Sequence, residues 1–308
     1  MSLKPPPKHT PKLQPKAPPK VNSDPESPAE DEFSDDGLPS GPTSQVVAMT
    51  SLGWLAVAPP GFGKSELFST FPDSLMLACE AGHKFITCPK IIIDTWAGKG
   101  TEEDDDGNKH MSFETAMDLL ENSARYKFIF LDTLDALIKK CVDHHIGAKR
   151  AEHLSDLGDY GKGFDLGQND PIRKALNRLF STGRGVGLIT HQQINTSNFK
   201  KKGPESKKET SLPNGIFKIV YPQMDIIIHG EYGGVREGNK HKDRIIKSEG
   251  DEDILAKNRG GILPSAFISP LDLKARGEQI MSFFQTDPVK RKAAVAAAEK
   301  EYRDLYEG

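Results

Sequence analysis

Short apolar runs alternate with amphipathic stretches from residue 46 onward, and this alternation predicts the elements of the fold. The predicted strands are 53–57, 74–78, 91–94, 127–131, 186–190, 224–229 and 244–247. The predicted helices are 65–71, 113–124, 171–181 and 288–306. The run KFIFL at 127–131 is continuously apolar, which is typical of a parallel strand covered on both faces. The pattern therefore predicts an α/β fold with a mostly parallel sheet and helices on both faces.

The first 45 residues have a different composition and hold 11 of the 22 prolines. Residues 1–20 carry five lysines and no acid, whereas residues 21–40 carry seven acids and no base. Apolar residues are too few there to offset the entropy of ordering, so a disordered tail is expected. It is either a solubilising linker or a partner-docking segment anchored by Phe33. The expected organisation is a tail over 1–45, a core over 46–286 and a C-terminal helix over 287–308.

Charge and cysteine content exclude several classes of protein. The 41 Lys and Arg nearly balance the 44 Asp and Glu, so any contact with a polyanion would be local. Apolar runs stay well short of the roughly 18 residues of a membrane span, and the first residues lack the apolar stretch of a secretory signal. The three cysteines have no paired spacing, which argues against a disulfide framework or structural zinc. A cytoplasmic protein without a membrane partner is expected.

The strongest motif is APPGFGKS at residues 58–65, between an apolar strand and a helix. It has the phosphate-loop spacing, with Ala58 in place of the first glycine. Glycines in such a loop let backbone N–H groups form an anion nest at a helix N-terminus. Lys64 is expected to reach the β- and γ-phosphates of ATP, and Ser65 to bind Mg²⁺. The residues predicted to contact the nucleotide are Pro60, Gly61, Phe62, Gly63, Lys64, Ser65 and Glu66.

Polar side chains that follow three later strands complete the predicted nucleotide site. Asp132 ends FIFLD and is predicted to hold the water shell of Mg²⁺. Glu80 follows the strand 74–78 and is the candidate base for the attacking water. His191 and Gln192 end the strand 186–190, where they can sense the γ-phosphate. The alternatives are an aspartate that caps a turn before the next helix for Asp132, a surface position for Glu80, and a simple strand-end cap for His191 and Gln192.

The order of these parts resembles the RecA-like P-loop ATPases. The segments that carry the resemblance are APPGFGKS, CEAGH, KFIFLDTLD, GLITHQQ and AKNRGG, and it covers roughly residues 46–270. The chain is most similar to the phage-encoded RecA-like proteins of the Sak group, which are implicated in single-strand annealing and recombination. The resemblance implies that Glu80 activates water and that Gln192 couples the γ-phosphate to a DNA-binding loop.

The same resemblance implies an assembly. Lys257 and Arg259 resemble a basic pair that reaches the nucleotide of a neighbouring subunit, which makes the protein a homo-oligomer with ATP at its interfaces. Two bases one residue apart on an extended segment point to the same side, so both can meet one triphosphate. The alternative is a pair of solvated bases in a turn before two glycines.

A polar segment at 195–213 is predicted to be a mobile loop that binds single-stranded DNA. Phe199 is available to stack on a base. The lysines that would meet phosphates are Lys200, Lys201, Lys202, Lys207 and Lys208. A second DNA loop is expected within 146–168, where glycines on both sides of Lys162 predict a turn or a close backbone approach. A solvated lysine-rich loop is the alternative.

Together these features predict a Mg²⁺-dependent, DNA-stimulated ATPase that promotes strand annealing and recombination in phage DNA metabolism. Its location would then be the cytoplasm of the bacterial host. One alternative is a nucleotide-gated adaptor whose tail recruits a recombination partner or a single-strand-binding protein; an intact Glu80 argues mildly against it. The other is a ring helicase-type motor, which the proline-rich tail disfavours.

Overall fold

The computed structural model describes residues 47–98, 100–159, 161–199, 203–235, 241–251 and 254–307. Within the strands at 185–210, the side chains of 195–199 and 203–207 lie outside this description. The tail predicted at 1–45 also lies outside the described residues.

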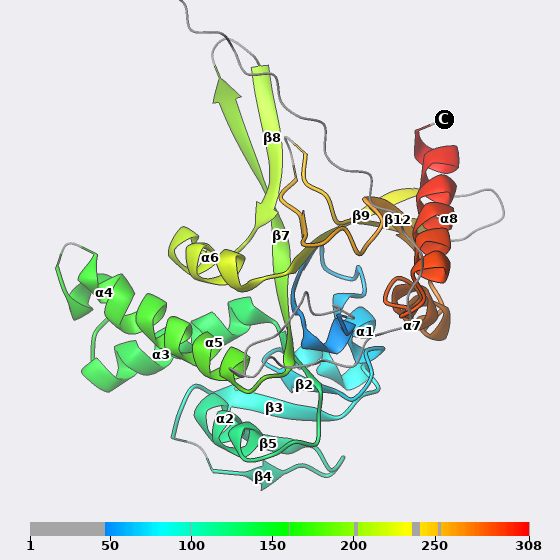
Figure 1. The fold of residues 1–308 in the computed structure, drawn as a ribbon. Helices are drawn as coiled ribbons and strands as arrows, with labels where there is room; N and C mark the ends of the chain where they lie inside the picture. Colours follow the sequence, from blue (N-terminus) through cyan, green and yellow to red (C-terminus); the bar gives the residue numbers. More distant parts are fainter. Residues whose placement is uncertain are drawn as a thin grey trace, which may run out of the picture. The chain divides into compact units, whose positions relative to one another are not determined.

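One mostly parallel sheet organises this part of the chain (Figure 1). Its order is β12-β10-β9-β1-β7-β6-β2-β3-β5-β4, with β11 beside β9 and β8 beside β7. The pairs from β9 through β1, β7, β6, β2 and β3 to β5 are all parallel. The pairs β12–β10, β10–β9 and β5–β4 at the two ends are antiparallel, as are the side pairs β11–β9 and β8–β7. The strands are β1 Gly53–Ala58, β2 Ser74–Ala78, β3 Lys90–Thr95, β4 Glu102–Glu103, β5 Lys109–Ser112, β6 Phe128–Asp132, β7 Gly185–Phe199, β8 Gly203–Thr210, β9 Ile226–Val235, β10 Lys242–Lys247, β11 Lys257–Asn258 and β12 Ala266–Ser269.

Helices cover both faces of this sheet. They are α1 Lys64–Ser69, α2 Phe113–Glu121, α3 Leu134–Lys149, α4 Lys162–Phe164, α5 Asp170–Ser181, α6 Asn214–Val220, α7 Leu273–Ser282 and α8 Pro288–Tyr306. One apolar cluster joins the sheet to α2, α3, α5 and α6, and a second joins the opposite face to α1, α7 and α8. This confirms the predicted α/β class, with a mostly parallel sheet and helices on both faces. Within the described part, no helix has both the length and the apolarity needed to cross a bilayer.

The predicted elements agree with the structure where a strand is buried on both faces or a helix has a clear cap. Strands β1, β2 and β6 are buried along their whole length, which explains their continuous apolar runs. The Ser112 hydroxyl accepts a hydrogen bond from Thr115 N and starts α2. Asp287 caps α8 in the same way, and α8 has the predicted bounds.

The prediction of a mobile loop at 195–213 is wrong, because most of this segment forms a β-hairpin. Strand β7 continues to Phe199 and pairs antiparallel with β8, from Gln192 opposite Thr210 to Phe199 opposite Gly203. The hairpin projects from the body of the fold (Figure 1). An isolated two-stranded ribbon has no core face to bury, so its sequence lacks the apolar alternation of a half-buried strand.

The loop expected within 146–168 is also largely helical. Helix α3 continues to Lys149, and short helical turns follow at Leu154–Leu157, α4 and Asp165–Asn169. The glycines on both sides of Lys162 provide the turn and the close backbone approach that the sequence predicted. Gly161 has φ +82°, and a Cβ on Gly163 would lie 1.8 Å from the carbonyl oxygen of Leu154.

One buried polar side chain, His229 of β9, makes stability depend on pH. Burial lowers the pKa of His229 from 6.5 to about 4. Four charged side chains add smaller effects: Lys208 and Lys247 lower this pKa, and Glu231 and Asp251 raise it. Between these pKa values the unfolded chain binds a proton that the folded chain does not. The contribution to the free energy of unfolding is therefore complete above pH 6.5 and is lost as the pH falls toward 4.

We expect the free energy of unfolding to be about 2 kcal/mol lower near pH 5 than near pH 7 because of this one imidazole. Urea unfolding of the wild type and of His229→Gln at both pH values measures the effect. The free energy of unfolding of His229→Gln should fall less between pH 7 and pH 5 than that of the wild type. Equal losses in the two proteins would contradict the assignment.

Candidate functional site

The phosphate loop, residues 58–65, carries the chain from the carboxyl end of β1 to the first turn of α1. Gly61 has φ +75° and Gly63 has φ +92°, a backbone region that favours glycine. The Lys64 ammonium is buried and donates hydrogen bonds to the carbonyl oxygens of Ala58 at 2.8 Å and Pro59 at 3.2 Å. The lysine thus lies back across its own loop, where it can turn toward a phosphate group.

Lys64, Asp132 and Ser65 form the charged centre of the site. Burial lowers the pKa of Lys64, and nearby carboxylates, Asp132 foremost, oppose this shift. Burial raises the pKa of Asp132, while a hydrogen bond from Ser65 and the charge of Lys64 oppose that shift. A hydroxyl and a carboxylate side by side are oxygen ligands suited to Mg²⁺. These residues therefore fit the ion, and Ser65 and Asp132 would hold it.

Glu80 stands beside this centre. Strand β2 pairs with β6 so that Ala78 lies opposite Asp132, and the chain reaches Glu80 two residues later. The Thr133 hydroxyl donates a hydrogen bond to the Glu80 carboxylate, and His191 Nε2 lies 3.4 Å from Glu80 Oε1. The Glu80 side chain is 39% exposed, so water can reach it. An oriented, accessible carboxylate next to a phosphate site is the arrangement that a general base requires.

His191 and Gln192 connect the site to the hairpin. In β7, His191 lies opposite Ala58 of β1, and Gln192 forms the first pair of the hairpin. The backbone N–H of His191 donates to Asp135 Oδ2 at 3.3 Å, and the Ser211 hydroxyl donates to the other oxygen of the same carboxylate. Asp135, at the start of α3, therefore joins β7 at His191 to the segment that follows β8 at Ser211. Sequence reasoning did not identify Asp135 or Ser211.

Glu66 was predicted to contact the nucleotide, but its carboxylate accepts hydrogen bonds from two arginines. Arg276 Nη1 lies 2.9 Å away and Arg244 Nη1 lies 3.2 Å away. Burial raises the pKa of Glu66, but the hydrogen bonds from the arginines outweigh burial and lower it. Arg276 is 1% exposed and also donates to the carbonyl oxygen of Gly63 at 3.3 Å. This cluster braces the phosphate loop.

Strand β9 supports the same loop from another side. A Cβ on Gly230 would lie 2.5 Å from the ring of Phe62, so only glycine lets this ring pack against the strand. The Tyr232 hydroxyl donates to the carbonyl oxygen of Pro60 at 3.4 Å, and its ring meets that of Phe62 edge-on at 5.8 Å. Tyr232 lies far from the motif in sequence, and no local spacing indicated its place beside the loop.

Lys257 and Arg259 lie away from the phosphate loop of their own chain. Lys257 pairs with the beginning of β9, and Arg259 Nη1 lies 2.7 Å from Asp225 Oδ1. The other oxygen of Asp225 accepts a hydrogen bond from the backbone N–H of Gly53, the first residue of β1. The phosphate loop follows the last residue of β1, so the basic pair and the loop lie at opposite ends of this strand. Their role at a neighbour's nucleotide stays a prediction.

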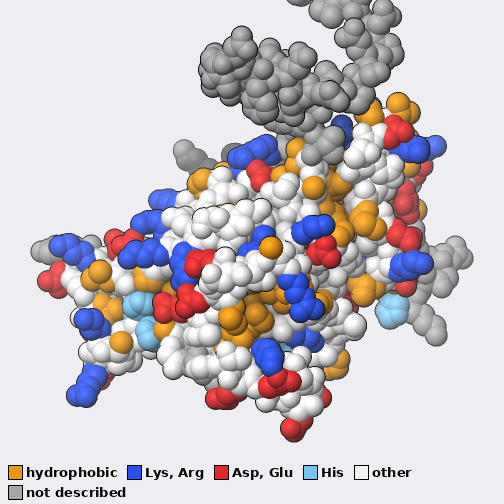
Figure 2. All heavy atoms as spheres, turned by 60° about the horizontal axis from the view of Figure 1, so that its bottom comes forward, with side chains coloured by type: hydrophobic (Ala, Val, Ile, Leu, Met, Phe, Trp, Pro, Cys, Tyr) orange, Lys and Arg blue, Asp and Glu red, His pale blue; other side chains and the backbone are white. Residues whose placement is uncertain are grey.

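The predicted DNA-binding residues are only partly described. Lys200, Lys201 and Lys202 lie outside the described residues, as do the side chains of Phe199 and Lys207. Lys162 is on α4, and Lys208 is on β8 with its ammonium 2.5 Å from Glu231 Oε2. The structure does not bring these two lysines together (Figure 1). On the face in Figure 2, basic and acidic side chains are interspersed, which agrees with the balanced composition.

A family model described as AAA domain matches residues 52–260, more than half of the chain. Among solved structures, a KaiC-like protein from the hyperthermophilic archaeon Pyrococcus horikoshii OT3 is similar, with a TM-score of 0.36 and 10% sequence identity. That match covers 73% of this chain and 88% of the other. No curated protein matches the sequence.

Proposed function

Because this chain belongs to the AAA domain family of nucleotide-binding ATPases, we propose that it hydrolyses ATP with Mg²⁺ and couples this reaction to single-stranded DNA. The observation that carries the proposal is the position of Glu80. This accessible carboxylate stands beside the buried Lys64 and Asp132, and it contacts His191 on the strand that continues into the hairpin.

The chemistry follows from the groups at the phosphate loop. ATP binding draws the Lys64 ammonium from the carbonyl oxygens of Ala58 and Pro59 to the β- and γ-phosphates. Glu80 accepts a proton from the water that attacks the γ-phosphorus, the bond to the bridging oxygen breaks, and ADP leaves with the electron pair. Thr133 and His191 orient the Glu80 carboxylate. Ser65 and Asp132 would hold Mg²⁺, which would neutralise part of the phosphate charge.

The DNA part of the proposal rests on the hairpin. One strand of the hairpin is the continuation of β7, the strand that carries His191 and Gln192. The sequence of the hairpin carries the lysines at 200–202, 207 and 208. Such lysines bind phosphates without sequence preference and lose affinity as salt rises. The proposed role is strand annealing and recombination in phage DNA metabolism, in a homo-oligomer in which Lys257 and Arg259 act on a neighbour's nucleotide. The tail would recruit a single-strand-binding protein.

Fluorescence anisotropy with a labelled oligo-dT tests the DNA part. The proposal predicts tighter binding with a slowly hydrolysed ATP analogue than with ADP. Replacing Lys200, Lys201 and Lys202 together by Ala should weaken binding by about tenfold or more. The matched control replaces Lys290, Lys292 and Lys300, three exposed lysines of α8, by Ala. Equal losses in the two triple variants would show that the hairpin is not the DNA site.

Asp135→Asn should uncouple hydrolysis from DNA, because Asp135 binds both His191 at the nucleotide site and Ser211 at the hairpin. The amide keeps the shape but loses the charge and one acceptor. We expect the ratio of DNA-stimulated to basal ATPase rate to fall by roughly fivefold or more, since charge-assisted hydrogen bonds are worth about 1.5–3 kcal/mol. Steady-state assays with and without oligo-dT measure this ratio.

The control for this variant is Asp143→Asn, an exposed aspartate on the same helix that pairs with Lys139. It should leave the ratio unchanged. If Asp135→Asn retained the wild-type ratio, the hairpin would have to sense ATP by another route.

A further inference from the structure

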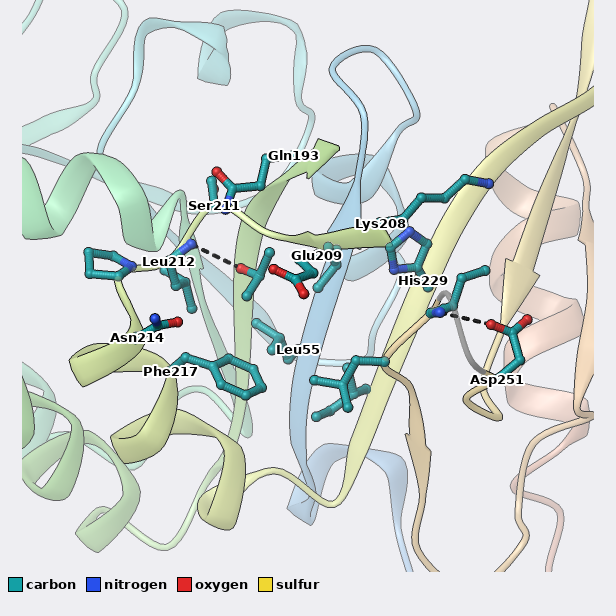
Figure 3. Close-up of a pocket in the computed structure, with 16 residues that line it drawn as sticks. Leu55, Gln193, Lys208, Glu209, Ser211, Leu212, Asn214, Phe217, His229 and Asp251 are labelled. Atoms are coloured by element: carbon teal, nitrogen blue, oxygen red, sulfur yellow. Dashed lines mark hydrogen bonds between the residues drawn. The ribbon is translucent and has the colours of Figure 1, made fainter. Parts of the chain in front are cut away.

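A cavity of 620 Å³ lies between the base of the hairpin, helix α6 and strand β9 (Figure 3). This volume is within the range of sites for small organic ligands. Its apolar wall includes Leu55 and Val57 of β1, Ile227 of β9 and Phe217 of α6. Its polar wall includes side chains of β7, β8, β9 and the segments beside them, namely Gln193, Lys208, Glu209, Thr210, Ser211, Asn214, His229 and Asp251.

This cavity is separate from the nucleotide site. Leu55, Val57 and Ile227 belong to the apolar cluster on the α6 side of the sheet. Phe62 of the phosphate loop and Leu67 of α1 belong to the cluster on the opposite side. The two sites communicate through Ser211, which lines the cavity and donates a hydrogen bond to Asp135.

The charged side chains of the cavity are already engaged. Lys208 pairs with Glu231, and Asp251 accepts a hydrogen bond from the backbone N–H of Ile254 at 2.8 Å. Glu209 is engaged as well. Lys208, the one Lys or Arg among the described lining residues, is already paired, so the wall offers no free positive charge to an anionic group.

Three neutral side chains in the wall have hydrogen-bonding capacity left. His229 is 1% exposed, and its Nε2 has no hydrogen-bond partner within the described structure. The amides of Gln193 and Asn214 are exposed and have no partner among the described residues. Figure 3 shows these groups on different sides of the cavity, with Phe217 below them. The two exposed amides are the polar groups that an occupant of the cavity can reach directly. His229 Nε2 is itself buried, so it would gain a partner only if the side chains around it moved.

These groups complement a flat, neutral heterocycle with donors and acceptors along its edge. Amide side chains recognise the edges of nucleobases, and aromatic side chains contact their faces. We propose that the cavity receives one unstacked base of a single strand whose phosphates follow the hairpin. This inference rests on the proposed binding of single-stranded DNA. An inserted base would contact α6 and both hairpin strands, and so would hold the hairpin against the part of the core that Asp135 joins to the nucleotide site.

The test compares an oligo-dT with an abasic oligonucleotide of equal length, by anisotropy with the full chain and an ATP analogue. The double variant Gln193→Ala, Asn214→Ala removes the two exposed amides, and Asn122→Ala, an exposed amide at the end of α2, is the matched control. In the wild type we expect dT to bind about tenfold more tightly than the abasic strand. The double variant should reduce this preference by several-fold, with abasic binding unchanged.

Each contrary outcome has its own meaning. If the wild type bound neither oligonucleotide, the proposed DNA binding would fail and the cavity inference with it. If the wild type bound both and the double variant kept the preference of the control, only the cavity inference would be overturned. Free thymidine is titrated in parallel. The wild type could bind thymidine saturably, and the double variant could lose this binding while its oligonucleotide binding stays unchanged. That result would show that the ligand of the cavity is a free nucleoside and not a base of a strand.

Discussion

Replacing Glu80 by Gln is expected to lower the rate constant of ATP hydrolysis by about 10²–10³-fold while ATP still binds. The amide keeps the size of the side chain and can still accept from the Thr133 hydroxyl, but it cannot take a proton from the attacking water. Single-turnover hydrolysis and equilibrium binding of a fluorescent ATP analogue separate the two effects.

The matched control for this substitution is Glu114→Gln, an exposed glutamate in the first turn of α2. It should leave both the rate and the affinity unchanged. A Glu80→Gln protein that hydrolysed ATP at the wild-type rate would remove Glu80 from the reaction, and the nucleotide-gated adaptor would then account better for the site.

Lys64→Ala should weaken the binding of ATP, the step that precedes hydrolysis. Its ammonium is the buried cation of the phosphate loop, and its loss removes charge-assisted contacts to the β- and γ-phosphates. Such contacts are worth about 1.5–3 kcal/mol each, so we expect ATP affinity to fall by roughly a hundredfold and hydrolysis to become undetectable. Isothermal titration with ATP measures the affinity.

The same substitution removes the charge of Lys64 from beside the buried Asp132 carboxylate, so the fold must be checked by thermal unfolding. The control is Lys174→Ala on the exposed face of α5. A folded Lys64→Ala protein with unchanged ATP affinity would mean that the loop at 58–65 does not hold the nucleotide.

The central strands and the phosphate loop could be predicted from the sequence because their signals are local. A strand buried on both faces needs a run such as FIFLD, and a phosphate nest needs glycines with positive φ followed by Lys and Ser. Helix caps such as Ser112 and Asp287 are local for the same reason.

The missed features depend on contacts between distant parts of the chain. Arg244 and Arg276 brace Glu66 from the other end of the sequence, and no spacing in the motif reveals them. Helix α3 was missed because charged residues and two adjacent histidines interrupt its apolar positions; His144 is exposed, whereas His145 packs against Trp96. The hairpin was taken for a loop because a ribbon exposed to water on both faces lacks apolar alternation.

We propose that ATP hydrolysis at Glu80 is coupled to single-stranded DNA through the strand β7. The most direct test is the steady-state rate of ATP hydrolysis with and without oligo-dT, with Lys64→Ala as the blank. We expect a several-fold higher rate with oligo-dT, and we expect this stimulation to be lost in Lys64→Ala and to shrink as salt rises. Hydrolysis at the same rate with and without oligo-dT, at low salt and saturating ATP, would contradict it.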